Sequence, residues 1–319
     1  MTVQEYILQS VSNLKKPEVF LADQEPLVEE ISRLVLSKKF RKYSANEELI
    51  KHIKNAIRLK VEKNEPINIT FLQGAYKLWR LEEAPEADWA ELFVATYYTN
   101  WVKDICTIYQ PGVWFDYFVD DLIVPMIDNL SLDEINAYVD SFQQVLDFLK
   151  SHQPQNLKMT ITRVGDQFES PEAFYASVEK NAEKVRQTNP SFTEEQLRVV
   201  ELNARPTAEQ LKDPQWREKV NIIHDGYMLT KREPGYHHRP DKILAFTQPL
   251  PSGSTVSVGT AKTSIAKHWV GVGALKKLGK GYREYIFSPT QLQKREFIKE
   301  TLEIDGLPGK NFQSIRVFS

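Results

Sequence analysis

The 319-residue sequence contains a single cysteine, Cys106. One cysteine excludes an intrachain disulfide and a cysteine-based zinc cluster, and it is typical of proteins from a reducing compartment. No apolar run approaches the ~18 residues of a membrane span, and residues 1–16 lack the basic start and apolar core of a signal peptide. These absences predict a soluble, cytoplasmic protein with no membrane contact.

Three motifs of catalysis and nucleotide binding are also missing. The sequence has neither GxxxxGK[ST] nor HExxH, and Gly259, Gly271 and Gly273 do not follow the GxGxxG spacing of a dinucleotide site. The pair Asp120 and Asp121 is compatible with a metal, a general base or a turn, and the turn is the commonest of the three. We therefore expect neither a metal nor a cofactor.

The net charge of -2 hides an uneven distribution. From residue 210 to the end there are 18 Lys and Arg against 10 Asp and Glu, whereas the preceding part has 23 against 33. This imbalance favours a small anionic ligand on the C-terminal part, or contact between the two parts, more than nucleic acid, which usually requires a strongly basic domain.

Strand-like and helix-like segments alternate in the first half of the chain. Helical periodicity and caps predict helices within 25–63, from Pro85 to Pro111, and from Ser131 to Lys150. Apolar, β-branched segments predict strands at 66–73, 113–121 and 157–164. Alternation of this kind predicts a Rossmann-like α/β fold with a mostly parallel sheet and flanking helices.

The character of the sequence changes after about residue 170. Residues 171–230 are predicted to be a largely helical insertion, and residues after Gly235 are glycine-rich, basic and β-leaning. We predict a larger domain at 1–232 and a smaller, basic, β-rich lobe at 233–319.

The segment "FLQGAYKLWRLEEAPEADWAELF" gives the first candidate site. In a parallel sheet, ligands lie outside the carboxyl ends of strands, near helix N-termini. Gly74 would allow close approach of a ligand, and Lys77 and Arg80 would bind phosphate or carboxylate. The alternative is a surface loop whose cations pair with nearby glutamates.

The helix after this loop begins with two carboxylates. Asp88 and Glu91 lie three residues apart and would share one face, where they could receive a substrate ammonium or transfer a proton. The alternative is simple compensation of the helix dipole, which explains Glu91 less well.

Further candidates are spread along the chain. Asp120 lies at the end of the second predicted strand, and a small-residue loop ending in Lys262 could cradle a phosphate through its backbone amides. The polar stretch 224–242 contains Lys231 and Arg232 for anion binding and His237 as a candidate proton carrier. Structural histidines and a solvated basic hairpin edge are the alternatives.

Three stretches together resemble a known family. "KNAIRLKVEKNEPINITFLQGAYK", the acidic "PEADWAELF" helix and "IYQPGVWFDYFVDDLIV" look like the N-terminal half of the isocyanide (isonitrile) synthases of pyoverdine/dityrosine biosynthesis. The similarity spans about residues 45–140. Members of that family have a lysine-bearing loop after a strand, a P-D-x-x-E helix, and a Y-x-P-G turn before a strand that ends at Asp.

The resemblance implies a cytoplasmic enzyme of secondary metabolism, a lyase or transferase. It would condense the amine of an amino acid with the ketone of ribulose 5-phosphate and fragment the sugar, without metal or redox cofactor. Under it, Lys77, Asp88, Glu91 and His237 would be catalytic. Gly74, Arg80, Asp120, Lys231, Arg232 and Lys262 would bind substrate.

Two other functions remain open at this point. The basic lobe could bind nucleotide or RNA through Trp269, Tyr282 and Tyr285, or the chain could be a non-catalytic relative that serves as a scaffold. A homodimer is possible under any of the three.

Overall fold

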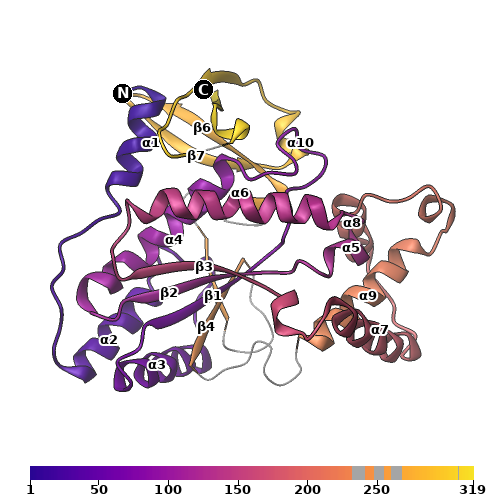
Figure 1. Cartoon of the computed structure of the whole chain (residues 1–319), viewed down its shortest axis with the longest axis horizontal. Coiled ribbons are helices and arrows are strands. Elements are labelled where there is room, and N and C mark those ends of the chain that lie inside the picture. Colours follow the sequence, from indigo (N-terminus) through magenta and orange to yellow (C-terminus); the bar gives the residue numbers. More distant parts are fainter. Residues whose placement is uncertain (232–240, 248–254, 260–267, 308) are drawn as a thin grey trace.

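The core of the protein is a five-stranded parallel sheet (Figure 1). This computed structural model describes all residues except 232–240, 248–254, 260–267 and 308. The strands follow the order β3-β2-β1-β4-β5, and every neighbouring pair is parallel. Their bounds are β1 (Ile67–Gln73), β2 (Val113–Val119), β3 (Leu157–Arg163), β4 (Lys242–Phe246) and β5 (Thr255–Ser257). The predicted α/β fold is confirmed.

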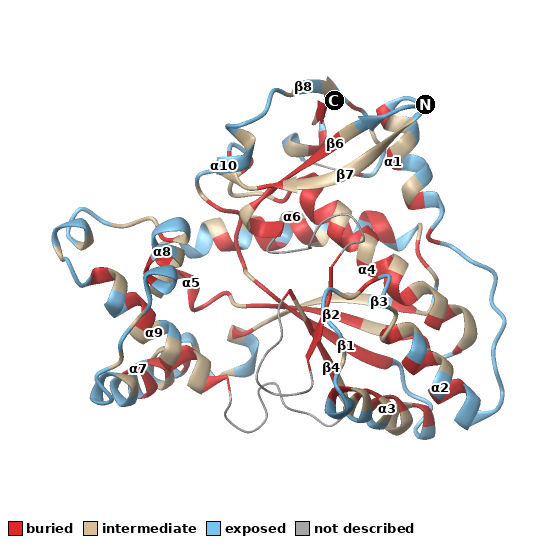
Figure 2. Ribbon diagram, turned by 180° about the vertical axis from the view of Figure 1, so that it is seen from behind, coloured by how far each residue is buried: buried red, intermediate tan, exposed pale blue. Residues whose placement is uncertain are grey.

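The apolar sequence of β1 suits its place in the middle of this sheet. All seven of its residues are buried, and its apolar side chains Ile67, Ile69 and Phe71 have at most 1% exposure. A strand covered on both faces needs a nearly continuous apolar sequence. Figure 2 shows the resulting buried centre, with exposure increasing toward the outer helices.

Helices cover both faces of the sheet. Along one face, α4 (Trp89–Ile108) and α6 (Leu132–Lys150) contribute Tyr98 and Phe142, whose rings contact Phe115 and Tyr117 of β2. The remaining helices of the first part are α1 (Val3–Ser12), α2 (Gln24–Val35), α3 (Glu47–Glu62) and the short α5 (Val124–Ile127), and α3 contacts β1 and β4.

A helical segment projects from the side of the sheet (Figure 1). It comprises α7 (Pro171–Gln187), α8 (Glu194–Asn203) and α9 (Trp216–Thr230), with the 3-10 turns η1 (Gly165–Gln167) and η2 (Gln210–Lys212) beside them. Both α7 and α8 pack on α9. Val200, Ala204, Trp216 and Val220 form a small apolar cluster of their own, apart from the main core.

A separate mixed sheet forms the C-terminal lobe, as predicted. Its order is β7-β6-β9-β8, with β6 parallel to β9 and the other pairs antiparallel. The elements are η3 (His268–Val270), β6 (Val272–Leu278), β7 (Gly281–Phe287), α10 (Pro289–Leu292), β8 (Ile298–Thr301), η4 (Lys310–Phe312) and β9 (Ser314–Phe318). The boundary at 232 stays a prediction, and β4 and β5, which follow it, lie in the parallel sheet.

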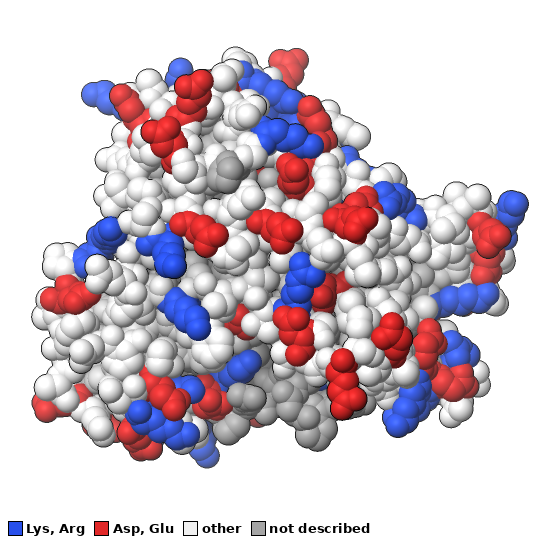
Figure 3. Space-filling model, in the orientation of Figure 1, with Lys and Arg blue, Asp and Glu red and all other residues white. Residues whose placement is uncertain are grey.

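The surface carries charges of both signs. On the face shown in Figure 3, Lys and Arg side chains are interspersed with Asp and Glu. Among the described helices, none is long and apolar enough to cross a membrane.

Candidate active site

The strand order reverses direction at the carboxyl ends of β1 and β4. From β1 the chain proceeds to β2 and β3 on one side, and then returns to β4 on the other side of β1. Such a reversal separates the loops that follow the two strands, and ligands of α/β proteins bind there. The loop that begins at Gly74 leaves β1 at this point.

Lys77 lies in this loop and is bound by two carboxylates. Its Nζ is 2.6 Å from Asp88 Oδ1 and 2.9 Å from Glu91 Oε2, and it also donates to the carbonyl oxygen of His268 at 3.3 Å. The side chains of Lys77, Asp88 and Glu91 have at most 1% exposure. The structure therefore brings together three of the residues that the sequence singled out.

The start of α4 explains why the two carboxylates meet. Asp88 is the N-cap, its Oδ1 accepts from the amide of Ala90 at 3.0 Å, and Glu91 at the third helical position accepts from the amide of Asp88 at 2.9 Å. This reciprocal capping box turns both side chains toward the helix start. Asp88 Oδ2 also accepts from the amide of Gly273 at 2.9 Å, which ties the second sheet to the site.

Burial controls the protonation of this group. It raises the pKa of Glu91 to about 8, although the positive charge of Lys77 acts in the opposite direction. Burial alone would lower the pKa of Lys77, but Asp88 and Glu91 outweigh it, and the net shift is upward. A carboxyl group with a pKa near neutrality beside a permanent cation is suited to general acid–base chemistry.

A short hydrogen-bond chain connects Glu91 to the end of β1. Tyr138 of α6 donates its hydroxyl to Glu91 Oε1 at 3.2 Å, and Gln73 Nε2 donates to the Tyr138 hydroxyl at 3.2 Å. Both residues are buried. Tyr138 therefore holds Glu91 in a defined orientation.

Several aromatic rings pack together here, and one of them belongs to His268, whose carbonyl accepts from Lys77. Ring centroids are 4.8 Å apart for Phe71 and Tyr98, 4.9 Å for Tyr117 and Phe142, and 6.1 Å for Phe142 and His268. His268 also stacks on Phe71 at 6.3 Å. We call Phe71, Tyr98, Tyr117, Phe142 and His268 the aromatic cluster.

Several polar atoms in and beside this cluster are buried without a partner. Within the described part of the chain, no hydrogen bond reaches the hydroxyls of Tyr98 and Tyr117, either ring nitrogen of His268, or Oε1 of Gln73. Buried polar atoms are nearly always paired, so a concentration of exceptions marks a place for water or a ligand. Burial, with a smaller effect of Lys77, lowers the pKa of His268 well below its usual value, so its imidazole is neutral at pH 7.

One solved structure resembles this chain over most of its length. The crystal structure of the PvcA protein from Pseudomonas aeruginosa superposes with a TM-score of 0.67, over 92% of this chain and 100% of that chain. The chain shares the PvcA fold. At 14% sequence identity, the likeness to PvcA concerns the fold.

Other comparisons are weaker than the one with PvcA. A tyrosyl-tRNA synthetase from Pyrococcus horikoshii, solved with L-tyrosine, matches at 12% identity and a TM-score of only 0.30, over 64% of this chain and 48% of that chain. Neither a family profile nor a curated protein matches the sequence.

A second polar group lies at the end of β2. Lys231 Nζ is 2.7 Å from Asp120 Oδ1 and 4.3 Å from the centre of the Tyr227 ring, and the Tyr227 hydroxyl donates to Asp120. Burial lowers the pKa of Lys231, although Asp120 opposes this shift. The amide of Asp120 donates to the carbonyl of Gln73, so this group adjoins the end of β1.

The remaining predicted residues have varied positions. Gly74 lies beneath Trp269, whose Nε1 would be 2.6 Å from an added Cβ. Arg80 donates to the carbonyl oxygens of Glu201 and Leu202 in α8. Arg232, His237 and Lys262 lie outside the described residues.

Sequence patterns did not single out the aromatic cluster or Tyr138. The tyrosines of the cluster fall in apolar helix and strand segments, where an aromatic residue indicates core packing. His268 was noted beside Lys267 in a glycine-rich stretch, but the pattern there assigned it no role. No group of three or more His, Cys, Asp or Glu within the described ranges could hold a metal ion.

Proposed function

We propose that this chain is an isocyanide synthase-like enzyme that condenses the amine of an amino acid with the ketone of a ketose phosphate such as ribulose 5-phosphate. The observation that carries the proposal is the buried pair of Lys77 and Glu91 beside the unpartnered atoms of the aromatic cluster. The fold shared with PvcA supports an isocyanide synthase-like function in general.

Proton transfer is the first requirement of this chemistry. The amine attacks the ketone carbon, nitrogen loses protons, and the former carbonyl oxygen gains protons and leaves as water. Glu91, with a pKa of about 8, can give or take a proton near neutral pH, and Lys77 stabilises its anion. Asp88 positions Lys77 rather than acting on the substrate.

His268 and the tyrosines supply the second requirement, which is recognition. A neutral imidazole carries one donor and one acceptor nitrogen, and the hydroxyls of Tyr98 and Tyr117 can do both. We assign these atoms to the polar groups of the substrates, and the rings of the cluster to an aromatic amino acid side chain.

Phosphate binding is assigned to the group at the end of β2. Lys231 is buried against Asp120 at the same edge of the sheet, and a phosphate that displaced Asp120 would gain a partly desolvated ammonium. Arg80 could also bind the phosphate only if its hydrogen bonds to the carbonyl oxygens of α8 were broken.

The direct test is product formation. Ribulose 5-phosphate labelled with carbon-13 at the ketone carbon is incubated with the protein and with each aromatic amino acid, and a tetrazine traps any isocyanide for mass spectrometry. We expect an adduct that carries the label. If no adduct forms and neither substrate raises the melting temperature, the proposal is wrong and a non-catalytic role is favoured.

RNA binding by the C-terminal lobe remains a prediction. In the structure, Trp269 is buried and the Tyr282 ring packs against Tyr6, with centroids 5.7 Å apart. RNA affinity that falls steeply with salt would support that function instead.

A further inference from the structure

A polar cavity lies between the loop before α4 and the second sheet. Its volume is about 310 Å³, and its wall includes Glu83, Asp88, Trp89, Lys310, Asn311 and Arg316. This volume falls within the range of small-molecule sites. Residues 82–89, which lead into α4, and residues 273–316 of the second sheet and its loops both contribute to the wall.

Two of the three cations in this wall form ion pairs with glutamates. Arg316 binds Glu83 and also Glu82 at 2.9 Å, and Lys299 binds Glu82 at 3.0 Å. Lys310 has no ion pair with any residue the structure describes. The cavity thus has one cation that is not neutralised within its wall.

Glu83, which lines this cavity, has an unused acceptor oxygen. Its Oε1 accepts from Arg316, but its Oε2 is buried and has no hydrogen-bond partner in the described chain, and the side chain is only 9% exposed. An unsatisfied buried acceptor destabilises the fold, and more so when it is charged. A donor from a ligand would remove that cost.

We propose that this cavity binds a small zwitterion of amino acid size. Its ammonium group donates to Glu83 Oε2, and its carboxylate faces Lys310. A simple anion would meet the carboxylates of Glu83 and Asp88, and a simple cation would meet Arg316 and Lys310, so a ligand with both charges fits the wall best.

The proposal does not rest on the proposed function. It concerns binding, and its ligand is defined by the cavity's own charges. The two sites share one residue, because Asp88 lines the cavity and also binds Lys77 through Oδ1.

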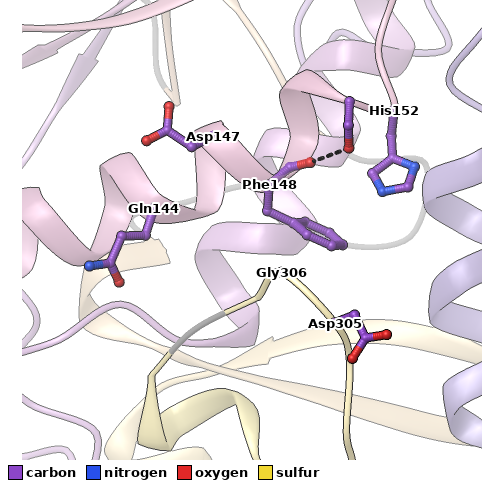
Figure 4. Close-up of a pocket in the computed structure, with 7 residues that line it drawn as sticks. Gln144, Asp147, Phe148, His152, Asp305 and Gly306 are labelled. Atoms are coloured by element: carbon purple, nitrogen blue, oxygen red, sulfur yellow. Dashed lines mark hydrogen bonds between the residues drawn. The ribbon is translucent and has the colours of Figure 1, made fainter.

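A second cavity, of about 350 Å³, lacks converging polar groups. It lies between the end of α6 and the turn at Asp305 and Gly306. In Figure 4, Asp147 and Gln144 lie on one side of Phe148, and His152 and Asp305 lie on the other, so these polar groups do not converge. We assign no ligand to it.

Isothermal titration calorimetry with L-alanine tests the zwitterion site. Ethylamine and propionate serve as its two halves, each with one of the charges. We expect saturable binding of L-alanine that is at least tenfold tighter than that of either half. Equal binding of one half would overturn the proposal, as would the absence of saturable binding by L-alanine.

Variants locate the binding. Glu83→Gln replaces the acceptor with an amide of the same size, and Lys310→Ala removes an exposed cation without touching the core. Each is expected to weaken L-alanine binding at least tenfold, whereas Lys280→Ala, in the exposed turn between β6 and β7, leaves it unchanged. If both cavity variants fold and bind like the parent, L-alanine binds elsewhere and the assignment is wrong.

Discussion

Lys77 Nζ lies 2.9 Å from Glu91 Oε2, and neither side chain has any exposed surface. Lys77 also pairs with the buried Asp88 at 2.6 Å, and removing one partner of a buried ion pair alone typically costs about 3–5 kcal/mol. Mutation of Lys77 to Ala would therefore confuse a catalytic effect with unfolding. Glu91 offers the sharper test.

Glu91→Gln should remove catalysis and keep the fold. Gln retains the size of Glu and an oxygen for the amide of Asp88, but it cannot exchange a proton. We expect isocyanide formation to fall about 100-fold or more. Glu134→Gln is the matched control, because Glu134 occupies the same capping-box position in α6. Equal activity of both variants would remove Glu91 from the mechanism.

The stability of the protein should fall as the pH rises from 6.5 to about 8. Burial raises the pKa of Glu91 from its ordinary 4.5 to about 8, so the folded state holds a proton that the unfolded chain has lost. This contribution is fully present below pH 4.5 and is lost as the pH rises through about 8. Starting at pH 6.5 avoids most of the opposite effect of His268, whose pKa is lowered by burial.

Urea denaturation followed by circular dichroism measures this effect. The parent should lose up to about 1.4 kcal/mol per pH unit in this window relative to Glu91→Gln. Parallel curves for the two proteins would show that Glu91 is ionised at pH 7.

Tyr98→Phe and Tyr117→Phe should leave stability unchanged or raise it, while both lower activity. Each substitution removes a buried hydroxyl that has no described partner. Tyr109→Phe is the control, because its hydroxyl donates to the carbonyl of Glu65 at 2.8 Å, and its loss should cost about 1 kcal/mol. Thermal denaturation and the tetrazine assay give the two quantities. Full activity of both variants would show that substrate does not use these hydroxyls.

Gly74→Ala should destabilise the protein by about 1–3 kcal/mol, because the new Cβ would lie 2.6 Å from Trp269 Nε1. Gly281→Ala is the control, since nothing lies within 4 Å of its Cβ position. The free energies of unfolding of the two variants are compared in urea. A neutral Gly74→Ala would mean that Trp269 does not cover the start of this loop.

Lys231→Met should raise the KM for ribulose 5-phosphate at least tenfold with little change in kcat, if Lys231 binds the phosphate in the ground state and the transition state alike. Lys219→Met in α9 is the control, because Lys219 pairs with Asp213 at 2.6 Å on the exposed side. An unchanged KM would leave the Asp120–Lys231 pair as a purely structural contact between β2 and the helical segment.

The sequence predicted the first three strands and their helices because each has a local pattern. A largely apolar, buried run marks β1, alternating apolar and polar residues mark β3, and Ser131 marks the start of α6. By contrast, β5 has three residues and joins the sheet by pairing with β4, which a local pattern does not specify.

The candidate site was predictable to a similar extent. Asp88 and Glu91 stood out because of their spacing at a helix start, and the structure shows a capping box that also binds Lys77. Tyr98, Tyr117 and His268 come from α4, β2 and η3, so only tertiary packing brings them together.

The buried charges around Lys77 are completed by groups that are synthesised late. Lys77 and Asp88 depend on the carbonyl of His268 and the amide of Gly273 for their remaining hydrogen bonds. During synthesis, β1 leaves the ribosome long before these two groups exist. The nascent protein must therefore keep an ammonium and two carboxylates solvated until almost its whole length has emerged, and only then can it dehydrate them.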